Sequence, residues 1–205
     1  IPNWMAPIFY SEKKSFWNTK PVLQYNETAQ TSSYIEDLCN RKLYNKQKPI
    51  DLPNGMEWIN INVKDIINSE VVCTFLNECY DQIPKIIFTP NLLDLILGPK
   101  HVLLGIVKKD DNTFCGVIGC CIRNTIIYDK TKPFAHGVLL CARNIYRKKN
   151  ITQTMINELI RYLYMDHDIS YGLFSSTRKF FQPISVYNTY LRPLNFIKLC
   201  NTNFI

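Results

Sequence analysis

The sequence predicts an α/β domain in which helices flank one mixed β-sheet. Apolar residues recur every three or four positions in two separate segments, which is the period of an amphipathic helix, and continuous apolar runs of strand length lie between those segments. Helices and strands therefore alternate in mixed order, an arrangement that folds as a sheet covered by helices. At 205 residues the chain is long enough to form one well-packed core.

Residues 1–57 show no sustained periodicity and contain several turn-forming Pro, Asn and Gly residues. We therefore expect an extended arm with one short helix. The arm is predicted to wrap around a domain formed by residues 58–205 and to make one structural unit with it.

Two helices are expected before the first long strands. One lies between Val63 and Tyr80, and a second covers residues 90–97. The predicted buried stripe of the first helix consists of Ile66, Ile67, Val71, Phe75, Leu76 and Cys79.

The segment from His101 to Tyr128 is predicted to be a β-hairpin. Two strongly apolar stretches, residues 101–108 and 114–128, flank the turn-forming sequence at residues 110–112. The next apolar run, Gly137 to Ala142, is the expected third strand.

A basic loop follows that strand and leads into a helix predicted over residues 151–165, with Asn150 as its N-cap. Beyond this helix we expect a strand over residues 171–175, a short helix over 187–191 and a last strand over 196–200. The aromatic residues of this last part are interpreted as core packing rather than as the lining of an acyl or peptide channel. They are Phe180, Phe181, Tyr187 and Tyr190.

The net charge of +7 and the pI near 8.9 favour an anionic partner. The Lys and Arg residues are spread along the chain instead of forming one stripe with interleaved aromatic residues, so a nucleic-acid partner is not expected. No apolar run reaches the length of a membrane-spanning helix, and the start has no signal-peptide pattern. These observations predict a cytoplasmic protein without a transmembrane segment.

Eight cysteines are present, and most of them lie inside apolar runs, where a thiol behaves as a small core residue. No Cys-x-x-Cys pair and no Cys/His ligand spacing occurs, so no metal site is expected. The cysteines expected in the core are Cys73, Cys115, Cys120, Cys121, Cys141 and Cys200.

The segment with the clearest chemical potential is the strand, basic loop and helix from Val138 to Leu163. A helix N-terminus presents free backbone N–H groups and the positive end of its dipole to an anion such as phosphate. Arg147, Lys148 and Lys149 precede that terminus and carry groups that bind a pyrophosphate. On spacing alone, a solvated basic loop before an ordinary helix is the favoured explanation.

The residues Arg147 to Thr152 resemble the pyrophosphate-binding turn of acetyltransferase-like enzymes and, more narrowly, the Arg-Ser-Lys-Arg loop of protein N-myristoyltransferases. Further segments resemble motifs of the N-terminal half of that family, in the same order along the chain. They are Phe16–Val22, Leu52–Trp58, Leu76–Tyr80, Ile126–Asp129, Leu140–Cys141 and Tyr190–Asn195.

The resemblance implies an acyl-CoA N-acyltransferase-like fold and a fatty acyl-CoA, myristoyl-CoA, as co-substrate without any prosthetic group. It implies that the backbone N–H groups of Leu139 and Leu140 form an oxyanion hole for the thioester carbonyl. It assigns the binding of CoA to two clusters. These are Ser15, Phe16 and Trp17 in the arm, and Cys141, Ala142, Arg147, Lys148, Lys149, Asn150, Ile151 and Thr152 in the basic loop.

In the family, the substrate is a protein or peptide whose N-terminal glycine amine attacks the thioester directly, so Cys141 is interpreted as a core thiol. The family's base is a C-terminal carboxylate carried by a second half, which the resemblance does not cover. Groove and loop positions also differ, because Leu191 replaces a histidine, Asn150 an arginine and Leu139 a phenylalanine. The acidic loop after Tyr80 is reduced as well.

None of the three histidines is assigned as a replacement base. His101 carries no specific prediction, His136 is interpreted as a turn residue that leads into the third strand, and His167 as a loop residue after the helix.

The sequence thus predicts an enzyme that transfers a fatty acyl group, myristate, from CoA to an N-terminal glycine amine. A homodimer or a partner chain would supply the second half. Two alternatives remain: an inactive acyl-CoA-binding or protein-binding pseudoenzyme, and an acetyltransferase, which rests on fold analogy alone.

Overall fold

The computed structural model describes residues 16–20, 22–28, 48–80, 86–127, 129–147, 150–176, 180–188 and 195–201. The chain divides into two compact units, one formed by residues 1–35 with 178–205 and one formed by residues 36–177. Each unit is described by itself.

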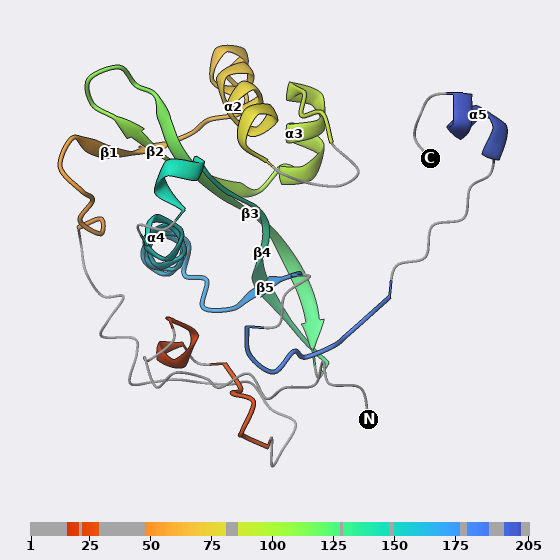
Figure 1. Cartoon of the computed structure of the whole chain (residues 1–205). Coiled ribbons are helices and arrows are strands. Elements are labelled where there is room, and N and C mark those ends of the chain that lie inside the picture. The colour runs from red at the N-terminus through yellow and green to blue at the C-terminus, as the bar shows by residue number, and fades with distance from the viewer. Residues whose placement is uncertain are drawn as a thin grey trace, which may run out of the picture. The chain divides into compact units, whose positions relative to one another are not determined.

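The larger unit contains a five-stranded sheet in the order β1-β2-β3-β4-β5 (Figure 1). Its strands are β1 Met56–Asn60, β2 His101–Lys108, β3 Phe114–Ile127, β4 Lys130–Ala142 and β5 Gly172–Phe174. All neighbours are antiparallel except β4 and β5, which are parallel. The α/β class with one mixed sheet is therefore confirmed.

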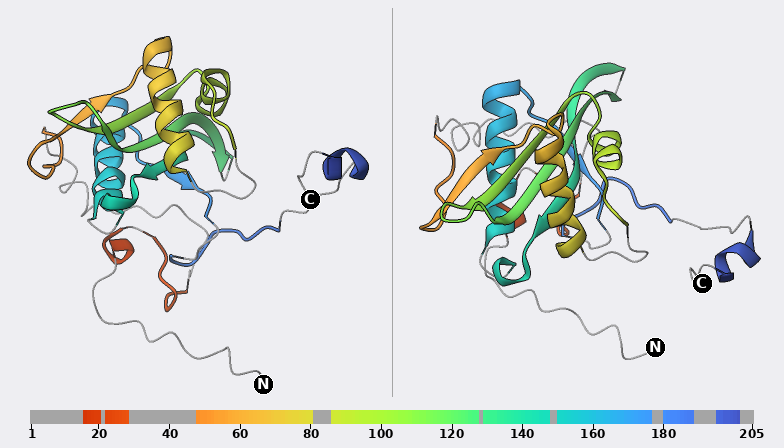
Figure 2. Two further views of the ribbon diagram at one scale, coloured as in Figure 1. Left: turned by 45° about the horizontal axis from the view of Figure 1, so that its top comes forward. Right: turned by 90° about the horizontal axis from the view of Figure 1, so that it is seen from above.

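Helices cover both faces of this sheet (Figure 2). Helices α2 Ile66–Cys79 and α3 Pro90–Leu97 pack on one face, where Leu103, Val107 and Val117 are buried against them. Helix α4 Ile151–His167 packs on the other face, against Leu104, Ile106 and Ile118. Because both faces are buried, β2 and most of β3 appear in the sequence as continuous apolar runs without alternation.

The predicted hairpin is confirmed as β2 and β3, but the third strand is longer than expected. β4 begins at Lys130 instead of Gly137, and its first half pairs with the distal half of β3. Lys, Thr and Pro residues dominate residues 130–133, and these residues are largely exposed, so the segment lacks the apolar signal of a buried strand.

Helix α2 begins after Asp65, whose carboxylate accepts a hydrogen bond from the Ile67 N–H at 3.0 Å. The predicted buried stripe is partly wrong. Ile66, Ile67 and Val71 are exposed, and the residues that face the core are Ser69, Val72, Cys73, Phe75 and Leu76. Apolar residues lie on both faces of the first two turns, so periodicity alone selects the wrong face.

Helix α3 has the predicted bounds, with Thr89 as its N-cap and Pro90 in its first turn. A side-chain amide joins α2 to the segment before α3. The Asn77 side chain accepts from the Phe88 N–H at 2.7 Å and donates to the Phe88 carbonyl at 2.9 Å. This pair of bonds explains why an asparagine stands inside the motif Leu76–Tyr80.

Helix α4 begins at the predicted residue and ends two residues later than expected. Asn150 lies at the N-cap position, but its backbone is left-handed (φ 60°) and its side chain makes no capping bond. The predicted capping role of the side chain is therefore wrong. The Asn150 carbonyl accepts instead from the Thr154 N–H at 3.0 Å.

Strand β1 was not predicted, and it begins inside the segment expected to be an arm. The residues before it are joined to α4 by a hydrogen bond to Glu158, whose carboxylate also forms a buried ion pair within that helix. Arg161 donates to Glu158, with the shortest contact at 2.7 Å, and Glu158 also accepts from the Ile50 N–H at 2.9 Å. The Trp58 indole donates to the Ile50 carbonyl at 2.8 Å.

The smaller unit contains the 3-10 helix η1 Phe16–Thr19 and the helix α5 Phe196–Asn201. The strand predicted over 196–200 is thus wrong, since Asn195 caps a helix by accepting from the Lys198 N–H at 2.9 Å. The Trp17 ring lies 5.8 Å from Phe180 and 5.0 Å from Phe181.

Two further expectations for the last part of the chain are not met. Tyr187 is 70% exposed, so it does not belong to a core. Residues 187 and 188 are not helical, and the rest of the predicted helix, Tyr190 included, lies outside the described residues.

Five of the six cysteines expected in the core are buried: Cys73, Cys115, Cys120, Cys121 and Cys141. Cys200 is exposed, which corrects its assignment to the core. Within the described ranges, no helix combines the length and the apolar character that crossing a bilayer requires.

Candidate functional site

The two parallel strands β4 and β5 pair over a short distance only. β5 pairs with residues Ala135 to Gly137, whereas β4 continues to Ala142. Over the part of the chain that the structure describes, no strand pairs with residues 138–142 on that side of β4. The second half of β4 therefore has an open edge.

A β-bulge lies where the two strands part. Gly119 of β3 pairs with Leu139 and Cys120 pairs with Gly137, so Val138 is the extra residue. The Arg143 N–H donates to the Cys115 carbonyl of β3 at 3.0 Å. Alternation along an antiparallel ladder then directs the N–H of Cys141 toward β3 and that of Leu140 away from it.

The N–H of Leu140 thus faces the open edge of β4. The Leu140 side chain is 41% exposed and that of Leu139 is buried. Leu139 borders the bulge, where regular alternation is interrupted. The expected oxyanion hole of Leu139 and Leu140 consequently lies on a stretch of β4 that, among the described residues, is paired with another strand on one side only.

The chain leads from this open edge directly into helix α4. After Ala142 come the 3-10 helix η2 Asn144–Tyr146 and then residue 150, which precedes the first turn of α4. The N–H groups of Ile151, Thr152 and Gln153 have no acceptor within the helix, because the first helical bond is the one from Thr154 to Asn150. The first turn contains no acidic residue. This terminus has the properties of a phosphate site.

Arg147 forms two bonds within the protein that the sequence did not predict, and its contact with CoA stays a prediction. Its Nε donates to the Ala142 carbonyl at 3.0 Å and its Nη2 donates to the Cys79 carbonyl at 2.6 Å. The guanidinium therefore joins the end of β4 to the last turn of α2. Lys148 and Lys149 lie outside the described residues.

Arg143 makes a second connection between the same elements. Its Nη2 lies 3.1 Å from the Glu78 carboxylate of α2, and its Nε donates to the Phe114 carbonyl at 2.7 Å. Two arginines from the β4–α4 connection thus hold the C-terminal turn of α2. No local pattern in the sequence indicates these bonds, because their partners lie at least 29 positions away along the chain.

The histidines do not gather near Leu140. His136 lies in β4 itself, which corrects its assignment to a turn, and its Nε2 is 3.2 Å from the Thr125 hydroxyl. Burial and the nearby positive charge of Arg123 lower the pKa of His136. His101 contacts the Gly98 carbonyl at 2.7 Å, and His167 is the last residue of α4 rather than a loop residue.

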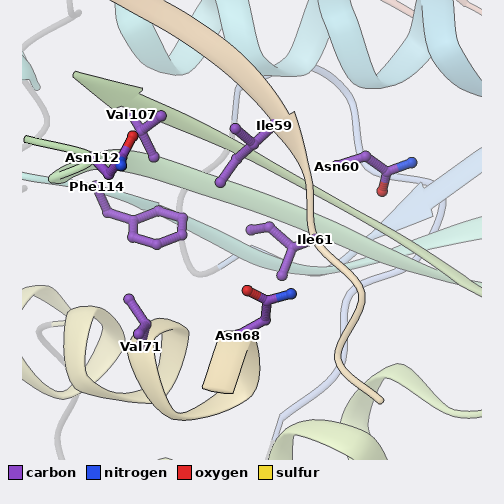
Figure 3. Close-up of a pocket in the computed structure, with 8 residues that line it drawn as sticks. All are labelled: Ile59, Asn60, Ile61, Asn68, Val71, Val107, Asn112 and Phe114. Atoms are coloured by element: carbon purple, nitrogen blue, oxygen red, sulfur yellow. The ribbon is translucent and has the colours of Figure 1, made fainter. Parts of the chain in front are cut away.

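A hollow of about 320 Å³ lies elsewhere, between β1, α2 and the β2–β3 turn (Figure 3). Its lining combines apolar and amide side chains and contains none of the predicted site residues. The lining residues are Ile59, Asn60, Ile61, Asn68, Val71, Val107, Asn112 and Phe114.

Structural comparison first defines a class. The fold is similar to that of an aminoglycoside acetyltransferase from an uncultured soil metagenomic sample, with a TM-score of 0.52 at 11% identity over 70% of this chain and 100% of that chain. It is more similar to the crystal structure of Saccharomyces cerevisiae N-myristoyltransferase with bound myristoyl-CoA. There the TM-score is 0.82 at 24% identity, over 95% of this chain and 47% of that chain. The fold is thus acetyltransferase-like.

Sequence comparison then identifies the family. Residues 36–187 match the family model of the N-terminal domain of myristoyl-CoA:protein N-myristoyltransferase, and the chain belongs to this family. It is 28% identical over 203 residues to glycylpeptide N-tetradecanoyltransferase 2 of Danio rerio, covering 94% of this chain and 40% of the relative. The corresponding Bos taurus protein is 28% identical over 200 residues, covering 92% and 39%. The chain thus spans about 40% of the length of these curated relatives.

The matched segment includes all predicted site residues from Leu139 to Thr152. The three arm residues lie before it. Ser15 is outside the described residues, and Phe16 and Trp17 belong to the smaller unit. Their predicted contact with CoA, like the predicted wrapping of residues 1–57 around the domain, stays a prediction. The side chain of Cys141 is 5% exposed, so only its backbone is available to a ligand.

Proposed function

We propose that the chain transfers a fatty acyl group, myristate, from its CoA thioester to the N-terminal glycine amine of a protein. The observation that carries this proposal is the open edge of β4, whose Leu140 N–H points away from β3 and whose end leads into an anion-binding helix terminus. A chain of this family with that geometry has the parts for holding an acyl-CoA.

The pyrophosphate of CoA would lie at the N-terminus of α4, against the N–H groups of Ile151, Thr152 and Gln153. Lys148 and Lys149 would add positive charge there. The Cys141 and Ala142 backbone would lie along the pantetheine arm between the phosphates and the thioester. Arg147 would keep the end of β4 in place through its bond to the Ala142 carbonyl.

The Leu140 N–H would donate to the thioester oxygen, and the bulge at Val138 would have to turn the Leu139 N–H toward the same edge for it to join. The neutral glycine amine attacks the carbonyl carbon, and the negative charge that develops on the oxygen is stabilised by these donors. When the C–S bond breaks, the electron pair leaves with the CoA sulfur. The proton that the amine releases goes to a base and then to the solvent, and the products are an amide and CoA.

We propose that the base and part of the acceptor groove come from a second half, since none of the three histidines lies near Leu140 in the described residues. A second copy of this chain or a partner chain would supply it. Analytical ultracentrifugation of the active protein tests the first option, and a strictly monomeric active protein would exclude both sources. A cytoplasmic location suits both acyl-CoA and nascent acceptors.

Calorimetric titration with myristoyl-CoA, acetyl-CoA and free CoA tests the binding step. We expect myristoyl-CoA to bind most tightly. Equal affinity for all three would remove the preference for a long acyl chain, and a lack of binding would remove the proposal. Tight binding combined with no transfer to a glycine peptide would favour a pseudoenzyme.

A further inference from the structure

The distal part of the β3–β4 hairpin projects beyond the rest of the sheet. β2 pairs with β3 only as far as Cys121 and β5 pairs with β4 only at residues 135–137, whereas β3 and β4 pair with each other up to Ile127 and Lys130. We call residues 122–127 and 129–134 the hairpin arm, which is visible in Figure 1 as the long two-stranded end of β3 and β4. Among the described residues, no third strand flanks this ribbon.

The base of the hairpin arm is fixed to the domain. The Phe134 ring is buried and stacks on Tyr171, with 5.2 Å between the ring centres. The Ile122 N–H donates to the Lys100 carbonyl at 2.7 Å. Lys132 Nζ donates to the Tyr171 hydroxyl at 2.9 Å. These contacts set the direction in which the arm projects.

The tip of the hairpin arm exposes a large apolar side chain. Ile126 lies in the second row of the ladder from the turn, opposite Thr131, and is 71% exposed. A single exposed isoleucine is common on a protein surface. At the end of a projecting ribbon, however, it is among the first side chains that a flat partner meets.

Cationic side chains flank this tip. The register places Lys130, Lys132 and Arg123 in the first, third and fifth rows from the turn, on one face of the ribbon. Arg123 and Lys130 are exposed, and within the described residues neither belongs to an ion pair. The arm contains one acidic residue, Asp129 at the turn. Three cations against one carboxylate make the arm complementary to an anionic surface.

The apolar and the cationic side chains reach the same flat surface when the tip points toward it. The ribbon is one sheet layer thick, so the side chains of both its faces lie around its end. The first and fifth rows are about 14 Å apart along the strands. Because a charge acts over about 8–10 Å at physiological salt, and lysine and arginine side chains are long, all three cations lie within range of a surface that the tip touches.

Partners of other kinds suit the arm less well. The Ala135 N–H donates to the Tyr171 carbonyl on the outer side of β4, so alternation turns the nitrogen of Pro133 to that side as well, where it supplies no donor to an added strand. Single-stranded nucleic acid binds through exposed aromatic rings. In the described part of the arm, the aromatic ring of Phe134 is buried.

We propose that the tip of the hairpin arm docks on an anionic lipid surface, with Ile126 at the apolar boundary of the bilayer and the three cations among the headgroups. A lipid surface offers both an apolar layer and a negative charge, which are the two features that the tip matches. The domain itself stays outside the bilayer. The inference does not rest on the proposed function, because the arm is separate from the open edge of β4.

The test measures co-sedimentation of the whole chain with vesicles of phosphatidylcholine alone and with vesicles that also contain about one-third phosphatidylserine. We expect binding to the anionic vesicles to be at least about tenfold tighter, with a difference that shrinks as salt is added.

Three variants locate the contact. Arg123→Glu combined with Lys130→Glu should weaken binding to the anionic vesicles by about 25-fold or more, since each cation near such a surface contributes about fivefold. Ile126→Asn keeps the charge and should weaken binding by about tenfold. The matched control is Lys64→Glu combined with Lys109→Glu, which changes the net charge equally at exposed positions away from the arm and should bind nearly as well as the wild type. Circular dichroism checks that each variant is folded.

A fourth variant, Ile126→Trp, reports on the tip directly, and its added fluorescence should shift to the blue when anionic vesicles are present. An unchanged emission overturns the inference, and so does equal binding to both kinds of vesicle or an equal loss in the two double variants. If Ile126→Asn binds like the wild type, or if an RNA oligonucleotide displaces the chain from the vesicles, the arm binds polyanions through charge alone and the inference fails.

Discussion

Replacing Glu158 with glutamine tests the buried ion pair of Glu158 with Arg161 within α4. The Glu158 carboxylate also accepts a hydrogen bond from the Ile50 N–H before the sheet. The side chain of Glu158 is 3% exposed and that of Arg161 is 7% exposed, and the closest contact between them is 2.7 Å. Glutamine keeps the shape and one acceptor for the Ile50 N–H, but it removes the carboxylate that pairs with the buried guanidinium of Arg161.

The expected loss follows from this burial. Removing one partner of a buried pair costs about 3–5 kcal/mol, because the remaining charge is uncompensated. For a chain of this length each kcal/mol lowers the melting temperature by about 2–4 °C, so Tm should fall by roughly 6–20 °C.

Urea unfolding followed by circular dichroism and by tryptophan fluorescence measures this loss, and Trp58 reports locally because its indole bonds to Ile50. Glu70→Gln, an exposed carboxylate on α2, is the control and should stay within about 0.5 kcal/mol of the wild type. The double variant Glu158→Leu with Arg161→Met should be more stable than Glu158→Gln. A loss below 1 kcal/mol in Glu158→Gln would refute the reasoning.

Three further predictions concern the site and its strand. Arg147→Met should weaken the binding of acyl-CoA and of acyl-pantetheine by the same factor, because Arg147 holds the end of β4 in place. Calorimetry measures both affinities. If only the affinity for acyl-CoA falls, Arg147 is a phosphate ligand instead. Leu140→Pro removes a backbone donor and should lower transfer by about 100-fold while Leu140→Ala retains it, and equal rates in a transfer assay would argue against the oxyanion role. Because the pKa of His136 in the folded protein lies below 6.5, protonation of His136 favours the unfolded state, and the free energy of unfolding should fall as the pH drops from 7 through 6.5 and below. His136→Gln should flatten this pH dependence in urea titrations. An unchanged dependence in the variant would contradict the prediction.

The sequence predicted the elements whose signals are local. Helix α3 and the β2–β3 hairpin have strong caps, turns or apolar runs, and they were located to within a residue. Strand β1 and the first half of β4 were missed, because a strand that lies at an edge or in an exposed ribbon does not need apolar side chains on both faces.

The contacts of the candidate site could be predicted only in part, because several of them join residues that are far apart in the sequence. The basic loop was found by its composition, but nothing local shows that Arg147 bonds to Cys79, which is 68 positions earlier in the chain. The bulge at Val138 likewise depends on the register with β3. The helix α5 was mistaken for a strand, since its six residues give too short a window for periodicity to decide.

The central claim is that the chain carries an acyl group from CoA to a glycine amine. Its most direct test incubates the purified protein with labelled myristoyl-CoA and a pair of peptides, one with a free N-terminal glycine and one with that amine acetylated. We expect label on the free peptide only, with release of one CoA thiol for each amide formed. Thiol release without any labelled peptide, or equal labelling of both peptides, would contradict it.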